Sequence, residues 1–369
     1  MRILHAGKFY APVTGGIETV LAALCEGTAD RWDVCAVVAN DGRQTVRERR
    51  HGVEVVRVGT LARALSVSLS PGLARELWGA RADCLVLHEP NPFVGTLLAI
   101  HRPAGRFVVW HHSDIVRPAW ANPTYGRVQR AMYRRADCVI VAAPPLAEHS
   151  ASVRAARRVE IIPYGVADPG LSGPTLDPAG EVARALARLP EPRVLYVGRL
   201  VYYKGLDVLL QAMAQTGGGL AIVGEGPQEA SLRGHIARLG LGERVTLLGR
   251  RTDAEVRGLY QACDVFVLPS TARTEAFGLV QVEAMLHGLP VISTDLPTGV
   301  PWVNEHGVTG LVVPPADVAA LAAALKRLLD DPPLRAKLGD AARERARVRF
   351  GQQRMVERFV EVVESVVHA

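Results

Sequence analysis

Two glutamates, Glu275 and Glu283, stand on either side of a predicted helix start in this 369-residue sequence. The apolar run 264–269 before them is typical of a buried strand, and the segment 278–288 has a helical pattern. A helix N-terminus presents free N–H groups and the positive end of the helix dipole, so it favours a phosphate group. We therefore predict a diphosphate over Gly278-Leu279-Val280, with a sugar on the Glu275 side and a ribose on the Glu283 side.

The spacing of these two glutamates argues against a pair that acts on one bond. The carboxyl groups of a retaining glycosidase lie about 5 Å apart. Here Glu275 falls in a loop and Glu283 about five helical residues further on, which separates them by roughly 7–8 Å along the axis. Two contacts to one extended ligand fit this spacing better. The structural alternative for Glu275 is a cap, because glutamates are common at helix starts.

Cations and glycines follow other predicted strands of the second half. Arg199 and Lys204 come after the strand that ends at Val197, where two cations would neutralise the charge of a departing nucleotide. The Walker pattern is not formed, and a salt-bridged loop is the structural alternative. Two further strand ends carry residues that we expect to pass close to a base or ribose, namely Gly224, Glu225 and Arg250.

Two stretches of the first half carry similar signals. The first strand runs into the loop 7–16, whose Gly15 and Gly16 would let a ligand approach the backbone, although a plain loop is an equal alternative. His112 ends a later strand, where it could bond a sugar hydroxyl or act on a proton. Its neighbour His111 would point to the opposite face, so we expect at most one of the two to face the ligand. A structural histidine is the alternative, and metal binding is not expected because no third ligand has suitable spacing.

Short β-branched runs alternate with helical patterns along most of the sequence, which predicts parallel sheets covered by helices. We predict an α/β fold of two Rossmann-like, doubly wound domains that face a cleft, with ligands beyond the carboxyl ends of the strands. The expected boundaries are 1–167 for the first domain, 168–192 for a proline-rich linker and 193–351 for the second domain, and the last helix, 352–369, is expected to pack back on the first. The predicted strands are 3–6, 34–39, 53–58, 84–88, 107–111, 138–141, 159–162, 194–197, 220–223, 245–248, 265–268, 291–293 and 311–313.

Composition narrows the class of protein. The net charge of +6 suits anionic ligands or an anionic membrane surface and is not a sign of nucleic-acid binding. The five scattered cysteines predict reduced core residues. No apolar run reaches the roughly 18 residues of a membrane span, and the N-terminus reads as a strand, so we expect a cytoplasmic protein. The arginine-rich segment 115–135 favours an ordinary helix over a lipid-facing surface, and the arginines of 43–50 favour a solvated loop.

Taken together, these motifs resemble the retaining, GT-B-fold glycosyltransferases of family 4 over essentially the whole length. The resemblance rests on Glu275 and Glu283 with seven residues between them, on Arg199 with Lys204, on Gly15-Gly16 and on His112. It implies an N-terminal acceptor domain and a C-terminal domain that binds a UDP- or GDP-sugar. Arg199 and Lys204 would bind the diphosphate, helped by the main-chain amides of Phe277, Gly278, Leu279 and Val280. Glu283 would bind the ribose, Glu275 the transferred sugar, and His112 would touch that sugar from the acceptor domain.

The resemblance also implies metal-independent transfer with retention, giving an α-glycoside, and no cofactor. The runs 112–117 and 298–303 look like bacterial enzymes that build surface polysaccharide, so a lipid-linked saccharide or other glycan acceptor is expected, with a peripheral contact at the inner membrane face. Three alternatives stay open: a glycosyltransferase with a small soluble acceptor such as an aminocyclitol, a sugar-nucleotide epimerase of the same architecture, and a non-enzymatic sugar-nucleotide-binding protein. No nucleic-acid partner is expected.

Overall fold

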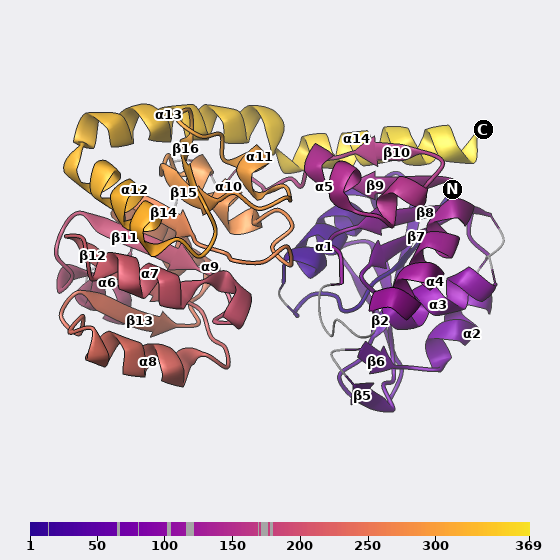
Figure 1. Cartoon of the computed structure of the whole chain (residues 1–369). Helices are drawn as coiled ribbons and strands as arrows, with labels where there is room; N and C mark the ends of the chain where they lie inside the picture. Colours follow the sequence, from indigo (N-terminus) through magenta and orange to yellow (C-terminus); the bar gives the residue numbers. More distant parts are fainter. Residues whose placement is uncertain are drawn as a thin grey trace. The chain divides into compact units, whose positions relative to one another are not determined.

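The structure is a computed structural model that describes residues 1–13, 15–64, 67–79, 81–101, 105–115, 122–168, 170, 176–177 and 180–369. The chain divides into two compact units, which are labelled by their elements in Figure 1. The first unit contains Met1–Gly165 together with Gln352–Ala369, and the second contains Val166–Gly351. Every strand predicted from the sequence is present, with ends that differ by one residue at most, because most of these strands are buried and read as continuous β-branched runs.

The first unit is built on an eight-stranded sheet with the order β10-β9-β8-β7-β1-β2-β4-β3. All neighbouring strands are parallel except β3 and β4, which are antiparallel. From β1 the chain adds strands on one side and then returns to β7 and adds strands on the other. The order therefore reverses between β1 and β7, and ligands of such sheets bind at the carboxyl ends of strands at this kind of switch point. The strands are β1 (Arg2–Ala6), β2 (Asp33–Ala39), β3 (Val46–Arg50), β4 (Val53–Val58), β7 (Cys84–Glu89), β8 (Arg106–His111), β9 (Cys138–Val141) and β10 (Val159–Ile161).

Strand β3 corrects one expectation, since the arginine-rich run was predicted to be a solvated loop. All five of its residues are exposed, and it forms the antiparallel edge of the sheet. Its charges are paired across the surface, with Arg57 bonded to Glu48 and Arg47 to Glu76. Charged side chains on an edge strand discourage pairing with another chain, and the same charges hide the strand from a search for apolar alternation.

The last helix of the chain belongs to the first unit. Phe359 of the last helix is buried, and its ring lies 6.2 Å from that of Trp32 and 5.7 Å from that of Trp110 in the first sheet. Arg31 of the loop after α1 is paired with Glu364 at 2.7 Å. The last helix therefore completes the core of the unit in which the chain begins. The helices are α1 (Gly16–Thr28), α2 (Gly72–Gly79), α3 (Pro92–Ile100), α4 (Asn122–Arg135), α5 (Pro144–His149) and α14 (Gln352–Val367), and β5 (Ala62–Ala64) and β6 (Val67–Leu69) form a separate hairpin.

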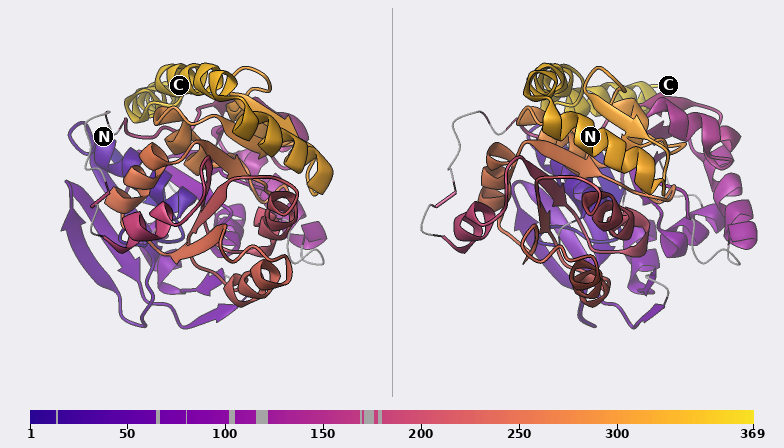
Figure 2. Two further views of the ribbon diagram at one scale, coloured as in Figure 1. Left: turned by 90° about the vertical axis from the view of Figure 1, so that its left-hand side faces the viewer. Right: turned by 60° about the vertical axis from the view of Figure 1, so that its left-hand side comes forward.

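The second unit contains a six-stranded parallel sheet with the order β13-β12-β11-β14-β15-β16. Helices cover the sheet, as the views of Figure 2 show. The order reverses between β11 and β14, which pair directly through Val194 and Val265. The strands are β11 (Arg193–Val197), β12 (Gly219–Val223), β13 (Val245–Gly249), β14 (Val265–Leu268), β15 (Val291–Thr294) and β16 (Gly310–Val313). The helices are α6 (Glu181–Ala187), α7 (Leu206–Met213), α8 (Glu229–Arg238), α9 (Asp253–Ala262), α10 (Leu279–Leu286), α11 (Val300–Val303), α12 (Val318–Asp330) and α13 (Pro332–Arg349).

The expected linker 168–192 contains a helix, α6, which belongs to the second unit. Val182 and Leu186 of α6 are buried, so this part of the stretch has a core-facing side. The prolines that suggested a linker obscured the short apolar pattern between them. The rest of the proposed linker lies partly outside the described residues, as do Arg117 and Trp120 of the arginine-rich segment.

The five cysteines are all buried free thiols, as predicted. Across the part of the chain that the structure describes, no helix is long and apolar enough to cross a membrane.

Candidate donor-binding and catalytic site

The switch point of the second sheet brings together two residues that the sequence singled out separately. Lys204 lies in a short turn after β11, and Glu275 lies in the loop after β14. The Lys204 ammonium donates a hydrogen bond to Oε2 of Glu275, and the Ser270 hydroxyl donates to the same oxygen at 3.1 Å. Lys204 and Glu275 are each only 8% exposed. The sheet therefore ends in a buried, mutually neutralised ion pair.

Backbone contacts hold the two loops at this distance. A Cβ at Gly205 would lie 2.0 Å from the carbonyl oxygen of Pro269, and the φ of Gly205 is +67°, so only glycine fits where the loops meet. The amide of Thr271 donates to the carbonyl of Tyr203 at 2.7 Å. Thr294 of β15 donates to the carbonyl of Ser270 at 2.6 Å. The ion pair thus rests on a rigid backbone frame.

Arg199, the second predicted cation, is exposed at the end of the same strand. The Tyr196 hydroxyl donates to its carbonyl at 3.1 Å, which fixes the main chain at that point. Burial raises the pKa of Tyr203, whereas the charges of Lys204 and Arg199 act in the opposite direction. Both cations are therefore close enough to affect one phenol. Within the described residues the Arg199 guanidinium has no ion-pair partner, in contrast to Lys204.

The helix start predicted to hold a phosphate follows directly. Helix α10 begins at Leu279, with Gly278 as its N-cap at a φ of +75°. Helix geometry leaves the amides of Leu279 and Val280 without an acceptor inside the helix. Phe277 anchors this turn, since its buried ring meets that of Phe350 edge-on at 5.8 Å. The Phe277–Phe350 contact therefore anchors the turn in the core, while the amides of the turn remain suitable for binding an anion.

Glu283 lies further along α10 and is partly buried. The hydroxyl of Tyr260, on α9, donates to its Oε2 at 3.0 Å. Burial raises the pKa of Glu283, and the Tyr260 hydrogen bond opposes that shift. The two glutamates therefore have separate partners, which are Lys204 with Ser270 for Glu275 and Tyr260 for Glu283.

Gly224, Glu225 and Arg250 lie at the same edge of the second sheet, at the ends of β12 and β13. A Cβ at Gly224 would approach the carbonyl oxygen of Gly198 to 1.9 Å, and its φ is +131°, so packing between strand-end loops already requires this glycine. The side chains of Glu225 and Arg250 are exposed. The structure thus places all three at the expected edge, with a structural reason for the glycine.

In the first unit, His112 belongs to a buried row of side chains that crosses three strands. Nδ1 of His5 lies 3.1 Å from Nε2 of His88, and Nδ1 of His88 lies 2.9 Å from Nε2 of His112. Nδ1 of His112 in turn lies 2.5 Å from the Tyr164 hydroxyl. We call His5, His88, His112 and Tyr164 the histidine row. Both ring nitrogens of His112 are thus engaged, so a bond to a substrate would require one of them to exchange partners.

Burial keeps these imidazoles neutral. It lowers the pKa of His5 and of His112 to about 3, and it lowers the pKa of His88 well below its ordinary value. The neighbouring His111 is also buried, with its Nδ1 2.8 Å from the Tyr133 hydroxyl. Both histidines are therefore buried at the strand end, and the prediction that at most one of them faces the ligand is not contradicted.

Gly15 and Gly16 lie at the start of α1, which follows the loop after β1. The amide of Thr19 donates to the carbonyl of Gly15 at 2.9 Å, which closes the first helical turn. These glycines are thus at the carboxyl edge of the first sheet, as predicted, while Thr14 lies outside the described residues.

Comparisons with known proteins identify the family of this chain. Residues 182–345 match the family model of glycosyl transferases group 1, and residues 15–165 match that of the glycosyl transferase 4-like domain. The D-rhamnosyltransferase WbpZ of Pseudomonas aeruginosa is 34% identical over 95% of this chain and 92% of its own length. The chain belongs to the group 1 glycosyltransferases. The O-antigen chain mannosyltransferase C of Escherichia coli is 29% identical over the full length of both chains.

Solved structures place the glycosyltransferase in the GT-B fold. The structure of Anabaena HepE in complex with UDP-glucose superposes with a TM-score of 0.80 and 26% identity, covering 99% of this chain and all of that one. Arg199, Lys204, Glu275 and Glu283 all fall within the segment that matches the group 1 family, and His112 falls within the 4-like segment.

Sequence reasoning missed a carboxyl group in the glycosyltransferase's first unit. Glu89 ends β7 at the switch point and is fully buried. Its carboxyl accepts hydrogen bonds from Tyr125 at 2.8 Å, from Gln129 at 3.0 Å and from the amide of Asn91 at 3.0 Å. Burial raises its pKa to about 7, although these donors act in the opposite direction. The signal that led to His112, a polar residue directly after an apolar strand, also marks Glu89.

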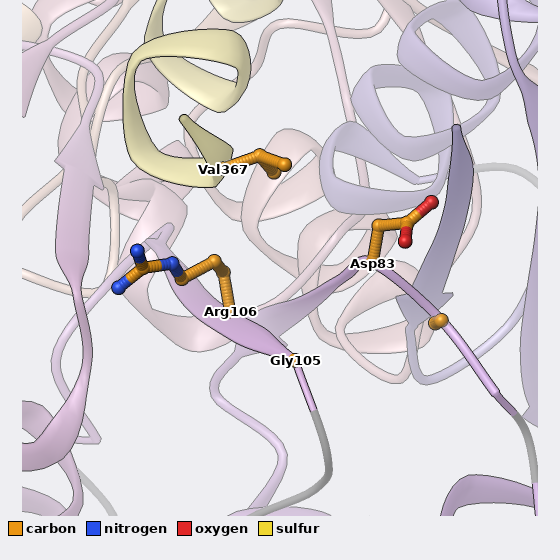
Figure 3. Close-up of a pocket in the computed structure, with 5 residues that line it drawn as sticks. Asp83, Gly105, Arg106 and Val367 are labelled. Carbon is orange, nitrogen blue, oxygen red and sulfur yellow. The ribbon is translucent and has the colours of Figure 1, made fainter. Parts of the chain in front are cut away.

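A hollow of about 580 Å³ lies at the opposite edge of the first sheet. Figure 3 shows Asp83 and Gly105 immediately before the strands β7 and β8, with Val367 from the last helix nearby. The carboxylate of Asp83 already accepts a hydrogen bond from the main-chain amide of Arg2 at 2.7 Å. Parallel sheets bind ligands at the carboxyl ends of their strands, and this hollow lies at the other edge of the sheet. Among the described residues, no group of three or more histidine, cysteine or acidic side chains has the arrangement to hold a metal ion.

Proposed function

We propose that this glycosyltransferase moves a sugar from a UDP- or GDP-sugar to a hydroxyl of a glycan acceptor, with retention and without a metal ion. The observation that carries the proposal is the contact of Lys204 with Glu275 beside the start of α10. One cation, one carboxylate and a set of amide donors are what a sugar diphosphate requires at neighbouring points. The complex of the related HepE with UDP-glucose supports a donor of this class.

In this proposal the donor lies along the carboxyl edge of the second sheet. Lys204, Arg199 and the amides of Phe277 to Val280 bind the diphosphate. Glu275 accepts hydrogen bonds from hydroxyls of the transferred sugar, and Glu283 accepts them from the ribose. Gly224, Glu225 and Arg250 pass near the base. Glu283 suits a ribose because the Tyr260 hydroxyl leaves acceptor capacity on the carboxylate, which has two oxygens.

The first unit supplies the acceptor side of the reaction, with Gly15, Gly16 and His112 at its carboxyl edge. In one role, His112 would contact the transferred sugar through the ring nitrogen that Tyr164 now occupies. In the other, its side chain would hold the main chain at the end of β8 in position without touching the sugar. Its buried, neutral ring suits a hydrogen-bonding role better than that of a cationic acid.

The reaction we propose occurs on one face of the sugar. The bond from the anomeric carbon to the phosphate oxygen breaks, and the acceptor oxygen bonds to the same face of that carbon. The proton of the acceptor hydroxyl passes to the departing phosphate oxygen. Lys204 and Arg199 stabilise the negative charge that develops on the phosphate, so no protein base is needed for this step.

The names of two relatives support one class of acceptor. WbpZ and the O-antigen chain mannosyltransferase C are named for rhamnosyl transfer and for O-antigen synthesis, which supports a lipid-linked saccharide of a surface polysaccharide as acceptor. We propose that the enzyme works in the cytoplasm, at the inner membrane face. A small soluble acceptor is the alternative that the acceptor assay below distinguishes.

Two measurements test the proposal. A panel of UDP-, GDP-, ADP-, CDP- and dTDP-sugars is scored for thermal stabilisation, because a ligand that binds only the folded state raises its stability. The donor that stabilises the protein is then incubated with glycan acceptors and with no acceptor, and the product anomer is determined by NMR. From an α-linked donor we expect an α-glycoside that forms only with acceptor. A β-glycoside from such a donor would refute retention, and an altered nucleotide sugar without acceptor would point to an epimerase.

A further inference from the structure

We propose that the Lys204–Glu275 ion pair is a clasp that opens for the intact donor and closes again to expel the nucleoside diphosphate. This inference rests on the donor site proposed above and concerns how that site releases its product. It starts from one contact: the cation assigned to the diphosphate is already bonded to the carboxylate assigned to the sugar.

The clasp is buried, so its two charges depend on each other. Lys204 and Glu275 are each 8% exposed, and removal of one partner of such a pair leaves the other as a desolvated, uncompensated charge. Any ligand that draws Lys204 away must therefore give Glu275 new donors. The Ser270 hydroxyl supplies one donor, and it remains bonded to Oε2 when the lysine leaves.

The intact donor can satisfy both halves of the clasp. Its phosphate replaces Glu275 as the partner of Lys204, and its sugar hydroxyls replace Lys204 as donors to Glu275. A nucleoside diphosphate without sugar offers only the phosphate, so Glu275 would lose its cation and gain no donor from the ligand. Formation of the Lys204–Glu275 bond therefore competes with binding of the nucleoside diphosphate, and it does not compete with binding of the intact donor.

Arg199 behaves differently, and this difference gives the site an order of events. Its guanidinium is exposed and, within the described residues, has no ion-pair partner. It can therefore bind the diphosphate without breaking an ion pair. Only Lys204 has to exchange one anion for another. The rigid loops at Gly205 and Ser270 keep both halves of the clasp within reach of each other during this exchange.

The test is the affinity for bare nucleoside diphosphates, measured by titration calorimetry with UDP, GDP, ADP, CDP and dTDP. In Glu275→Gln the amide keeps an acceptor for Ser270 but removes the charge that competes for Lys204. We expect this variant to bind the preferred diphosphate about tenfold more tightly than the wild type, a change of about 1.4 kcal/mol, even though transfer is lost. An unchanged or weaker affinity in a folded Glu275→Gln protein overturns the clasp.

Two controls separate the clasp from a general effect of charge. Asp207→Asn removes a partly buried carboxylate three residues from Lys204 that is not paired with it, and we expect less than about a twofold change in affinity. In the background of Lys204→Met, Glu275→Gln should no longer tighten binding, because a double-mutant cycle reports only the coupling of the two side chains. Tightening that persists without Lys204 also overturns the clasp.

The outcomes also separate this inference from the proposed function. If none of the five diphosphates binds the wild type, the donor site itself is wrong and the clasp falls with it. If one of them binds and Glu275→Gln fails to tighten it, the donor site stands and the clasp alone is wrong.

Discussion

The two sheets of this glycosyltransferase end in polar clusters of opposite character. At the first switch point, neutral imidazoles are joined in a row by hydrogen bonds and burial removes their charge. At the second, Lys204 and Glu275 stay together as an ion pair. Both clusters lie at carboxyl ends of parallel strands, so the difference comes from the side chains and not from the topology.

This difference indicates what each cluster can do. In a row of neutral rings each nitrogen depends on its neighbour, so a foreign partner disturbs every member. In an ion pair the cation can exchange one anion for another and the anion can exchange one donor for another, so both groups keep a partner. The histidine row is therefore suited to keeping the strand ends of the first sheet in fixed positions. The ion pair is suited to binding and releasing a charged substrate.

The largest expected effect is on the second cluster. Replacement Glu275→Ala should lower the rate of transfer by about a thousandfold, because the sugar loses a charged acceptor while the diphosphate keeps its cations. The nucleoside diphosphate should still bind. Steady-state kinetics and titration calorimetry on the same preparation check both parts. Equal loss of transfer and of nucleotide binding would mean that Glu275 holds the diphosphate site together.

The second prediction concerns the first cluster and pH. His5 and His112 have a pKa of about 3 in the folded state and His111 a pKa of about 4, whereas unfolded histidine titrates near 6.5. Below pH 6.5 the unfolded chain therefore binds protons that the folded chain does not. Each such histidine costs up to about 1.4 kcal/mol of stability per pH unit as the pH falls from 6.5 towards its folded pKa.

Glu89 acts in the opposite direction. Its folded pKa of about 7 lies above its unfolded value of 4.5, so it adds stability as the pH falls from 7 to 4.5. The histidines outnumber it, and we expect the urea midpoint to fall clearly between pH 7.5 and pH 5.5. Limited proteolysis should show that fragments of the first unit are lost first. The exposed His368 serves as control, since His368→Gln should not alter this dependence. A midpoint that is flat over this range would contradict a neutral histidine row.

The smallest expected effect is at Glu283, the residue that we propose binds the ribose. Tyr260→Phe removes the hydroxyl that donates to Glu283, so the pKa of Glu283 should rise further. Donor affinity should weaken by about twofold to tenfold, the value of one hydrogen bond. Donor titrations at several pH values measure this, and the loss should be greater at lower pH. Unchanged affinity would place the ribose elsewhere.

The sequence was sufficient for most strands of the two sheets, because these strands are largely buried and read as continuous apolar runs. It also located Lys204 and Glu275 individually, since each follows such a run. It did not reveal that they touch, because that contact joins residues 71 positions apart through a strand order that the sequence does not state. Strand β3 and helix α6 were missed for a local reason, since arginines and prolines conceal their patterns.

The histidine row shows the same limit more sharply. His5 and His88 lie inside apolar runs, where a single histidine does not indicate a polar cluster. Only the pairing of β1 with β7, and of β7 with β8, aligns them with His112. Glu89 is a different case, because its place after an apolar strand was visible in the sequence and was not used.

Helix α14 has a consequence for the order in which the molecule is made. Phe359 packs on Trp32 and Trp110, yet it leaves the ribosome some 250 residues after the last of them. The amino-terminal unit therefore has to wait, with an apolar patch beside His5 uncovered, while the whole of residues 166–351 is synthesised. During translation the second unit can therefore complete its core before the first one does, although it is made later.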